Sequence, residues 1–325
     1  MEFPHLLPSL SLLLLFTFSP LLSTTTVVTA QAPTPVFKCT TKSTCTALAG
    51  YVSPNTTTLG HIQSLFQLRS LRPLLAANGL PPSTPSTQKV LQNSTVRIPF
   101  PCRCNSGSGV SDHVPQYVVV KDDGLYHIAN DVFSGLMTYQ QIGAVNNIKD
   151  INLIYVGQKL WIPLPCSCDD VDGQQVVHYA HVVAVNSTVN GIATEFDTTS
   201  QTLMSLNGIT DPRKLIAGQV LDVPLKACSL SDVQTSSPDD LFVAANGTYL
   251  YTANNCSRCS CDAANHYTLQ CQPSGLTPAN ESICTAGTGA ALSPGTNGAW
   301  KIKQIGWSWA LVLVSIQLLI LHRFL

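Results

Sequence analysis

The pattern of apolar and polar positions repeats three times along the chain, over residues 51–99, 117–163 and 181–224. Each stretch opens with a short β-branched or aromatic run and closes with a strand-like run that ends in proline. Apolar residues at helical spacing lie between the two runs: Leu59, Leu125 and Val189, then Ile62, Ile128 and Ile192. Such a repeat predicts one small unit made three times, with the order strand, helix, helix, strand.

A turn precedes the closing run of each repeat and reads Asn78-Gly79, Asn146-Asn147 or Asn207-Gly208. The second and third repeats keep the same spacing from this asparagine to their terminal prolines. A βααβ unit of this length buries little surface, so it would be marginally stable alone and would gain from attachment to its neighbours. We therefore expect an α+β fold of three tandem βααβ units.

Cysteine pairs separate the repeats, as Cys102-Arg103-Cys104 and Cys166-Ser167-Cys168. Neighbours two positions apart do not bridge one another comfortably, because a disulfide needs a specific Cα separation and dihedral angle. In an extended segment both side chains point the same way and reach other parts of the molecule. These pairs predict disulfides between repeats, each stabilising the fold by about 2–4 kcal/mol.

Residues 1–30 have the character of a signal peptide. They hold a leucine-rich run, no Lys or Arg, and end on the small residues Val28-Thr29-Ala30. We expect cleavage after Ala30, with a retained membrane anchor as the alternative, because the usual positive charge is missing. Twelve cysteines and six glycosylation sequons also favour an extracellular protein. The sequons are at Asn55, Asn93, Asn186, Asn246, Asn255 and Asn280.

The C-terminal segment predicts a glycolipid (GPI) anchor. A flexible spacer over 285–299 leads into a propeptide over 298–325 with an apolar tail, the arrangement that such a signal requires. We expect attachment at Asn297, with Ser293 or Gly295 as alternatives. The other interpretation is a short transmembrane helix. Either way we expect no cytoplasmic domain, so signalling would need a transmembrane partner.

Composition argues against several function classes. The net charge of −1 does not suit nucleic acid, which favours a basic face. Glycoside hydrolysis usually needs two positioned carboxylates in a deep cleft, and the glutamates are only Glu2, Glu195 and Glu281. We therefore expect no enzyme activity and no cofactor. His178 and His181 lie three positions apart on one strand, so they face opposite sides and do not predict a metal site.

The region 226–284 is rich in cysteine and poor in apolar runs, which is typical of a small cystine-stapled module. Its Cys256-x-x-Cys259-x-Cys261 spacing also occurs in zinc sites. We expect no metal here, because secreted chains favour disulfides. The six cysteines that stay unassigned are Cys228, Cys256, Cys259, Cys261, Cys271 and Cys284.

The repeats resemble LysM modules, the βααβ units that bind N-acetylglucosamine polymers. The resemblance covers about residues 36–272 and extends to plant LysM GPI-anchored receptor-like proteins. It divides the chain into repeats over 36–104, 117–164 and 178–225 and the cysteine-rich region 226–284. Its most specific motifs are the segment from Tyr51 to Leu59, the segment from Leu160 to Asp169, and Thr252-Ala253-Asn254-Asn255-Cys256.

This resemblance implies several further expectations. The disulfides would be Cys39–Cys104, Cys45–Cys168 and Cys102–Cys166. The segments 177–183 and 221–228 are most similar to the branch that senses bacterial peptidoglycan, with chitin as the alternative ligand. The protein would act in innate immunity with a LysM receptor-like kinase, and a bound polymer could bridge two copies into a homodimer. A wall-adhesion protein and a glycan hydrolase are the rival classes. The family usually has a longer stretch before its anchor signal than this chain has after Cys284.

The family's ligand groove lies between two loops of a repeat. An N-acetyl group needs backbone hydrogen bonds and an apolar floor, and the middle repeat offers both. Repeats one and three carry sequons in these loops, so glycans there would crowd a sugar chain, whereas the middle repeat has none. For Leu125 we leave open core packing or ligand contact, and we expect Trp161 to be packed. The candidate site residues are Lys121, Asp122, Asp123, Gly124, Leu125, Tyr126, His127, Asn147, Ile148, Lys149, Asp150, Ile151, Asn152, Leu153 and Ile154.

Overall fold

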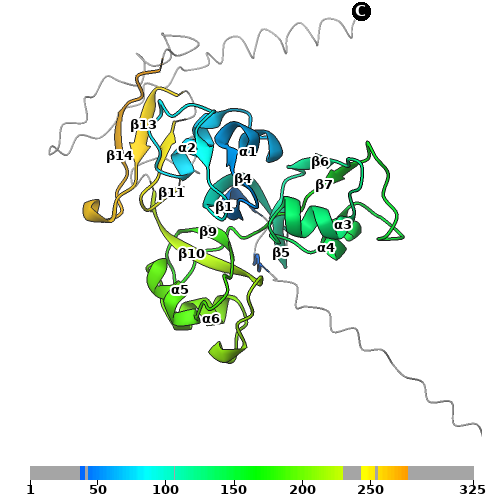
Figure 1. Ribbon diagram of the computed structural model, residues 1–325. Helices are drawn as coiled ribbons and strands as arrows, with labels where there is room; N and C mark the ends of the chain where they lie inside the picture. The colour runs from blue at the N-terminus through cyan, green and yellow to red at the C-terminus, as the bar shows by residue number, and fades with distance from the viewer. Residues whose placement is uncertain (1–36, 41–42, 106, 230–242, 253–254, 277–325) are drawn as a thin grey trace, which may run out of the picture.

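The computed structural model of the chain describes residues 37–40, 43–105, 107–229, 243–252 and 255–276 (Figure 1). The predicted signal peptide, the GPI signal with Asn297, the spacer 285–299 and the sequon at Asn280 lie outside these residues. Each of the three repeats contains a strand, two helices and a closing strand in that order. We call these units module 1 (residues 43–105), module 2 (116–161) and module 3 (176–229).

The elements of the modules have the following bounds. Module 1 contains β1 (Ser43–Val52), β2 (Thr57–Thr58), α1 (Leu59–Leu65), α2 (Leu71–Ala77), β3 (Lys89–Val90) and β4 (Thr95–Asn105). Module 2 contains β6 (Gln116–Val118), α3 (Leu125–His127), the π-helical turn η1 (Ile128–Val132), α4 (Tyr139–Val145) and β7 (Lys159–Trp161). Module 3 contains β9 (Val176–Val182), α5 (Val189–Glu195), α6 (Ser200–Leu206), the 3-10 turn η2 (Pro212–Lys214) and β10 (Val220–Ser229).

The remaining elements connect or extend the modules. β5 (Ser108–Ser111) and β8 (Pro165–Cys166) flank module 2 along the chain. The cysteine-rich region contains β11 (Val243–Ala245), β12 (Tyr249–Tyr251), β13 (Ser257–Ser260), the turn η3 (Ala263–Asn265) and β14 (Gln270–Pro273).

Threonine caps set where most of these helices begin. The hydroxyls of Thr58, Thr138, Thr188 and Thr199 accept hydrogen bonds from backbone N–H groups in the first turns of α1, α4, α5 and α6. Such caps satisfy donors that have no partner inside the helix. The first helix of module 2 differs, because its N-cap is Gly124, which offers no side chain.

An asparagine ends the second helix of each module and ties it to the closing strand. In module 2, Asn146 Nδ2 donates to the carbonyls of Ile142 and Trp161, both at 2.8 Å, and its Oδ1 accepts from Trp161 N–H at 2.9 Å. Asn78 and Asn207 make the same three contacts in modules 1 and 3. This triple hydrogen bond is the physical reason for the asparagine that recurs in the sequence.

The next residue after each asparagine lies in the left-handed region, with φ of +62° at Gly79, +54° at Asn147 and +64° at Gly208. Glycine and asparagine are the residues that tolerate this conformation most easily. The recurring Asn-Gly or Asn-Asn pair therefore ends the helix and turns the chain.

Modules 1 and 3 share one seven-stranded sheet, with the order β11-β10-β9-β1-β4-β5-β8. β1 pairs antiparallel with β4 and parallel with β9, so module 1 supplies the centre of the sheet (Figure 1). The join is tight at Gly50, where a Cβ atom would lie 2.2 Å from the Tyr179 hydroxyl. The separate repeats predicted from the sequence are thus merged by a strand pairing that the repeat pattern did not indicate.

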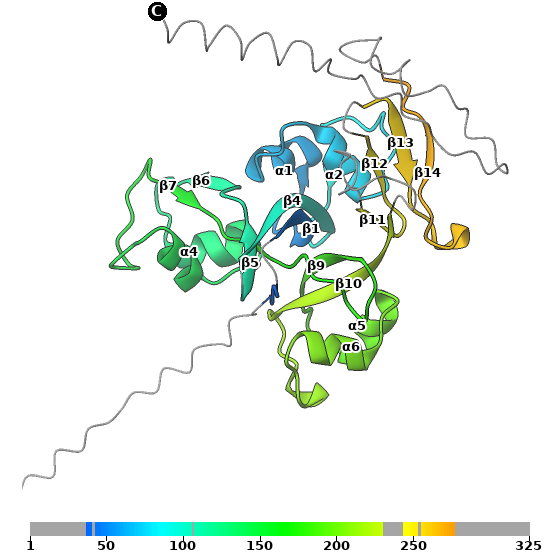
Figure 2. The same ribbon diagram turned by 180° about the vertical axis from the view of Figure 1, so that it is seen from behind.

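Module 2 keeps its own two-stranded sheet of β6 and β7 and projects from the shared sheet, as both views show (Figures 1 and 2). It packs on module 1 through edge-to-face rings, with Phe66 lying 5.2 Å from Tyr51 and 5.6 Å from Phe133. These rings belong to one buried apolar cluster that spans both modules. Module 2 is therefore anchored at its base while its loops face away from the sheet.

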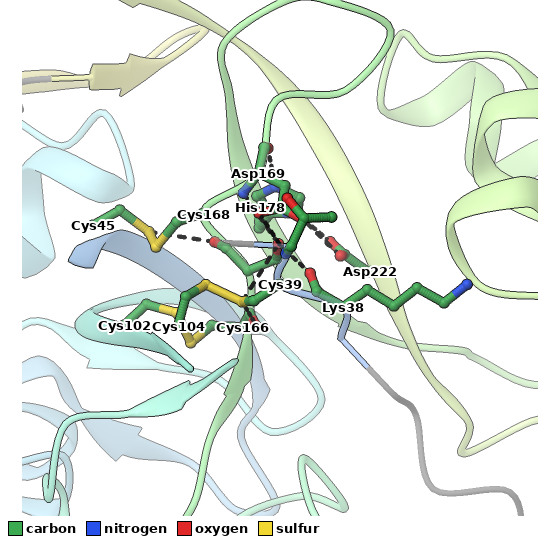
Figure 3. Close-up of a disulfide and its surroundings, with 12 residues drawn as sticks. Lys38, Cys39, Cys45, Cys102, Cys104, Cys166, Cys168, Asp169, His178 and Asp222 are labelled. Atoms are coloured by element: carbon green, nitrogen blue, oxygen red, sulfur yellow. Dashed lines mark hydrogen bonds and ion pairs between the residues drawn. A yellow bond between two sulfur atoms is a disulfide. The ribbon is translucent and has the colours of Figure 1, made fainter. Parts of the chain in front are cut away.

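Three disulfides tie module 1 to the segment before it and to the segment that follows module 2, and they are the pairs that the family resemblance implies: Cys39–Cys104, Cys45–Cys168 and Cys102–Cys166 (Figure 3). The sulfur atoms of Cys45, Cys102 and Cys168 lie within 4.8 Å of one another. β4 continues through Cys102 and Cys104, so both side chains leave the same face of an extended strand. The bridges thus form one cluster where the modules meet.

The cysteine-rich region has its own disulfides, Cys228–Cys261 and Cys259–Cys271. The zinc interpretation of the Cys256-x-x-Cys259-x-Cys261 spacing is therefore wrong, because Cys259 and Cys261 are not available as thiolates. The strands β12, β13 and β14 form a sheet that lies beside α2 in both views (Figures 1 and 2). The Tyr249 hydroxyl donates to the Leu80 carbonyl at 2.8 Å and attaches this sheet to module 1.

Candidate functional site

The start of α3 and the second predicted ligand loop of module 2 meet at helix α4. In the structure the first loop covers residues 119–124 and the second covers 146–158, so the candidates Leu125, Tyr126 and His127 lie in α3 rather than in a loop. Gly143 on α4 lies between Leu125 of α3 and Ile151 of the second loop, since a Cβ atom there would be 3.6 Å from Leu125 Cδ1 and 3.2 Å from Ile151 Cγ2. The absence of a side chain at Gly143 lets the start of α3 and the second loop approach each other.

The floor of this site is apolar. Leu125 is only 2 % exposed and belongs to the core that module 2 shares with module 1. Ile148 and Ile154 are half-buried and pack against the same core. The sequence left open whether Leu125 packs in the core or contacts the ligand, and the structure shows that it packs in the core.

The rim carries exposed apolar side chains. Tyr126 is 65 % exposed, and Leu153 and Ile151 of the second loop are 53 % and 38 % exposed. The Tyr126 ring leans on Tyr139 of α4, with centroids 6.1 Å apart. Exposed apolar groups gathered at one place commonly mark a binding surface. Sequence reasoning missed Val118, Val120, Tyr155 and Val156, which are also exposed here. The signal for Tyr155 and Val156 was the unbroken apolar character of residues 153–156 in a loop.

Backbone donors are also open at this place. No hydrogen bond within the described residues involves the N–H groups of Leu125, Tyr126 or His127. Because Gly124 provides no side-chain cap, these three donors at the helix start have no partner within the described residues. Together the floor, rim and donors can hold a group that has a carbonyl oxygen beside a methyl group.

The comparisons with known proteins identify the family of the chain. The LysM domain family matches residues 117–163 and 181–224. The LysM domain-containing GPI-anchored protein 2 of Arabidopsis thaliana is 49% identical over 243 residues, which cover 74% of this chain and 69% of the relative. The chitin elicitor-binding protein of Oryza sativa subsp. japonica is 48% identical over 244 residues, covering 74% and 68%. The chain belongs to the plant LysM domain-containing GPI-anchored proteins.

Among solved structures, the ectodomain of a receptor-like kinase is similar, with a TM-score of 0.48 and 21% identity over 55% of this chain and 91% of that chain. Membership of the LysM GPI-anchored family agrees with the expected location on the extracellular face of the membrane. Within the described residues, no helix has the length and apolar character needed to cross a membrane.

In this LysM protein, Asp123 supports the first loop. Its side chain is only 2 % exposed, and Oδ2 accepts from Tyr117 O–H at 3.0 Å and from Val120 N–H at 2.7 Å. Burial, together with this carboxylate, raises the pKa of Tyr117 to about 12. Asp123 was expected among the ligand contacts, but its carboxylate is used inside the loop.

The other predicted polar residues lie at the surface of the LysM domain. His127 Nδ1 contacts Asp131 Oδ2 at 2.8 Å, and Asp150 accepts from Asn152 N–H at 3.0 Å within the second loop. These contacts are exposed and local, so they shape the rim without closing the site. The exposed polar candidates are Lys121, Asp122, His127, Asn147, Lys149, Asp150 and Asn152.

Trp161 is packed, as expected. Its Nε1 donates to the Ser111 hydroxyl at 3.4 Å, and its ring lies 4.7 Å from that of His113.

All sequon asparagines within the described residues are exposed: Asn55, Asn93, Asn186, Asn246 and Asn255.

Proposed function

We propose that this chain is a cell-surface receptor-like protein that binds N-acetylglucosamine oligomers between the two loops of module 2. The observation that carries the proposal is the apolar surface formed by Tyr126, Ile151 and Leu153 beside the open N–H groups at the start of α3. An N-acetyl group would direct its carbonyl to a donor and its methyl to the apolar floor. We also infer that module 1 is a third LysM-type unit, because it has the same element order and asparagine contacts.

Chitin-type oligomers come first among the ligands in this proposal. One relative whose name states a ligand is the chitin elicitor-binding protein, at 48% identity. Bacterial peptidoglycan remains the second candidate, because it carries the same N-acetylglucosamine face and because segments 177–183 and 221–228 resemble the branch that senses it.

The proposed role in innate immunity requires a transmembrane partner. A chitin elicitor receptor kinase of Physcomitrium patens is 27% identical over 187 residues, which cover 57% of this chain and 28% of that protein. We propose a LysM receptor-like kinase as co-receptor, recruited through a shared ligand, and GPI attachment at Asn297. Crosslinking after ligand addition, and release by phospholipase, test these two points.

Competition binding tests the central proposal. The purified protein is titrated with chitin hexamer and with soluble peptidoglycan fragments, each competing against the other. Saturable binding of either glycan, weakened by changes in the module 2 loops, supports a receptor. Unchanged affinity after replacement of both loops would contradict the site. Released reducing ends would instead indicate a glycan hydrolase.

A further inference from the structure

The loop between the second helix and the closing strand is four residues longer in module 1 (78–94) than in modules 2 and 3 (146–158 and 207–219). The extra residues belong to a segment that we call the strap, residues 81–90. The strap contains Pro81, Pro82 and Pro85, which limit its backbone freedom. Two turns stiffen it further, since Thr84 N–H donates to the Pro81 carbonyl at 2.9 Å and Gln88 N–H to the Pro85 carbonyl at 3.0 Å.

The strap lies across the start of α1, at the place that corresponds to the proposed glycan site of module 2. Leu59 N–H donates to the Gln88 carbonyl at 3.0 Å, and Gly60 N–H donates to the Ser86 carbonyl at 2.8 Å. β3 of the strap also pairs with β2 of the first loop, with Thr57 opposite Val90. The chain's own carbonyls therefore occupy donors that a glycan would need.

Modules 2 and 3 lack this internal occupant. The corresponding N–H groups belong to Leu125 and Tyr126 in module 2 and to Val189 and Asn190 in module 3. None of these four groups donates a hydrogen bond within the part of the chain that the structure describes. The three modules therefore share a fold but differ in whether this position is open.

Gly60 is the residue that permits the contact. A Cβ atom at this position would lie 3.1 Å from the Ser86 carbonyl oxygen and 3.2 Å from Ser86 Cβ, closer than most real contacts. The corresponding residues are Tyr126 and Asn190, whose side chains would hold such a segment away. One glycine and four additional loop residues thus distinguish module 1 from its neighbours.

We propose that the strap fills the glycan position of module 1, so that this module takes no N-acetylglucosamine and serves as the packing centre of the protein. The proposal rests on the proposed function, since it concerns the same type of site. It excludes module 1 from glycan binding, because backbone carbonyls of the protein itself occupy the donors at the start of α1.

Residue-resolved hydrogen exchange of the whole protein, with and without N-acetylglucosamine hexamer, tests this assignment. In the free protein, the Leu59 and Gly60 amides should exchange at least about tenfold more slowly than those of Leu125 and Tyr126 after correction for intrinsic rates. The hexamer should slow exchange at Leu125 and Tyr126 and leave Leu59 and Gly60 unchanged. Equal exchange in the free protein, or slowing by the hexamer at Leu59 and Gly60, would overturn the strap proposal.

A variant gives a second test. Gly60→Tyr places beneath the strap the residue type that module 2 has at Tyr126, and it should speed amide exchange at Leu59 by about tenfold or more. The control is Gly124→Ala, whose added Cβ atom would contact nothing, and it should leave exchange at Leu59 unchanged. Unchanged exchange in a folded Gly60→Tyr protein contradicts the proposal. If this variant does not fold, the wild-type comparison decides. If the hexamer slows amide exchange in no module, the proposed function is overturned. If it slows exchange in module 1, the strap proposal alone is overturned.

Discussion

His178 and Asp222 form a buried pair that joins the two strands of module 3, with Nδ1 2.8 Å from one carboxylate oxygen and 3.0 Å from the other (Figure 3). The other ring nitrogen, Nε2, lies 2.7 Å from the Asp169 carbonyl oxygen, next to the disulfide cluster. Carboxylate and carbonyl oxygens only accept hydrogen bonds, so both ring nitrogens must donate. The arrangement therefore favours the charged imidazolium form.

This pair predicts a loss of stability at alkaline pH. Burial by itself lowers the pKa of His178, but the Asp222 carboxylate and the Asp169 carbonyl outweigh it, so the pKa is raised above 6.5. The folded state then holds a proton that the unfolded chain releases. The contribution is complete below about pH 6.5 and is lost as pH rises through the folded pKa. Urea unfolding should show that the free energy of unfolding declines from about pH 5 to pH 9. This decline should be smaller in His178→Gln and unchanged in His61→Gln, where the substituted residue is exposed. An unchanged slope in His178→Gln would contradict this.

His181 predicts the opposite effect at acid pH. Burial lowers the pKa of His181 to about 4, and its ring packs 5.1 Å from that of Phe196. The unfolded chain therefore binds a proton that the folded state rejects, and stability falls as pH drops from about 6.5 toward 4. His181→Phe keeps the ring contact, and its unfolding free energy should fall less than that of the wild type between pH 7 and pH 5. Equal losses in the two proteins would show that His181 is not the titrating group.

The asparagine contacts predict a large cost for a small substitution. Asn146→Ala removes the partner of the Trp161 N–H and of the Ile142 and Trp161 carbonyls. Each half-buried group left unsatisfied costs about 1–3 kcal/mol, so the variant should lose at least about 2 kcal/mol of unfolding free energy. Chemical denaturation measures this loss. The matched control is Asn105→Ala at an exposed strand end, which should change stability by less than about 0.5 kcal/mol. Similar small losses in both variants would contradict the role of Asn146.

The proposed site predicts that Tyr126→Ala weakens glycan binding. Truncation of a central aromatic contact typically costs more than about 1 kcal/mol, so Kd for the N-acetylglucosamine hexamer should rise about five- to tenfold. Tyr126→Phe keeps the ring and should bind nearly as the wild type does. Leu91→Ala is the control in module 1, since Leu91 is also 65 % exposed. Calorimetric titration distinguishes these outcomes, and equal Kd values for Tyr126→Ala and Leu91→Ala would reject the site.

The proposed site also predicts a strong dependence on oligomer length. A short oligomer fills one module, whereas a long one can bridge modules or two copies of the protein, and its effective concentration then increases the apparent affinity. We expect the octamer to bind at least about a hundredfold more tightly than the dimer. Surface-immobilised protein at low and high density measures this difference. Equal affinity for both lengths would exclude bridging.

Much of the local structure could be predicted from the residues themselves. Apolar spacing around Ile62, Ile128 and Ile192 marks the helices, and all three side chains are buried. The Asn-Gly and Asn-Asn pairs mark the helix ends, because the φ values there favour those residues. These signals act over a few residues, so they can be read directly along the chain. The disulfide pairs came from the family resemblance, since spacing alone left the pairings open.

Tertiary structure decided the features that depend on contacts between distant residues. The parallel pairing of β1 with β9 joins Leu48 to Tyr179, and no local signal marks it because both strands would also suit isolated units. The strap closes module 1 because Ser86 reaches Gly60 across the fold. The sequence by itself therefore determined the three units and their turns, whereas tertiary packing decided how they join and which of them is open.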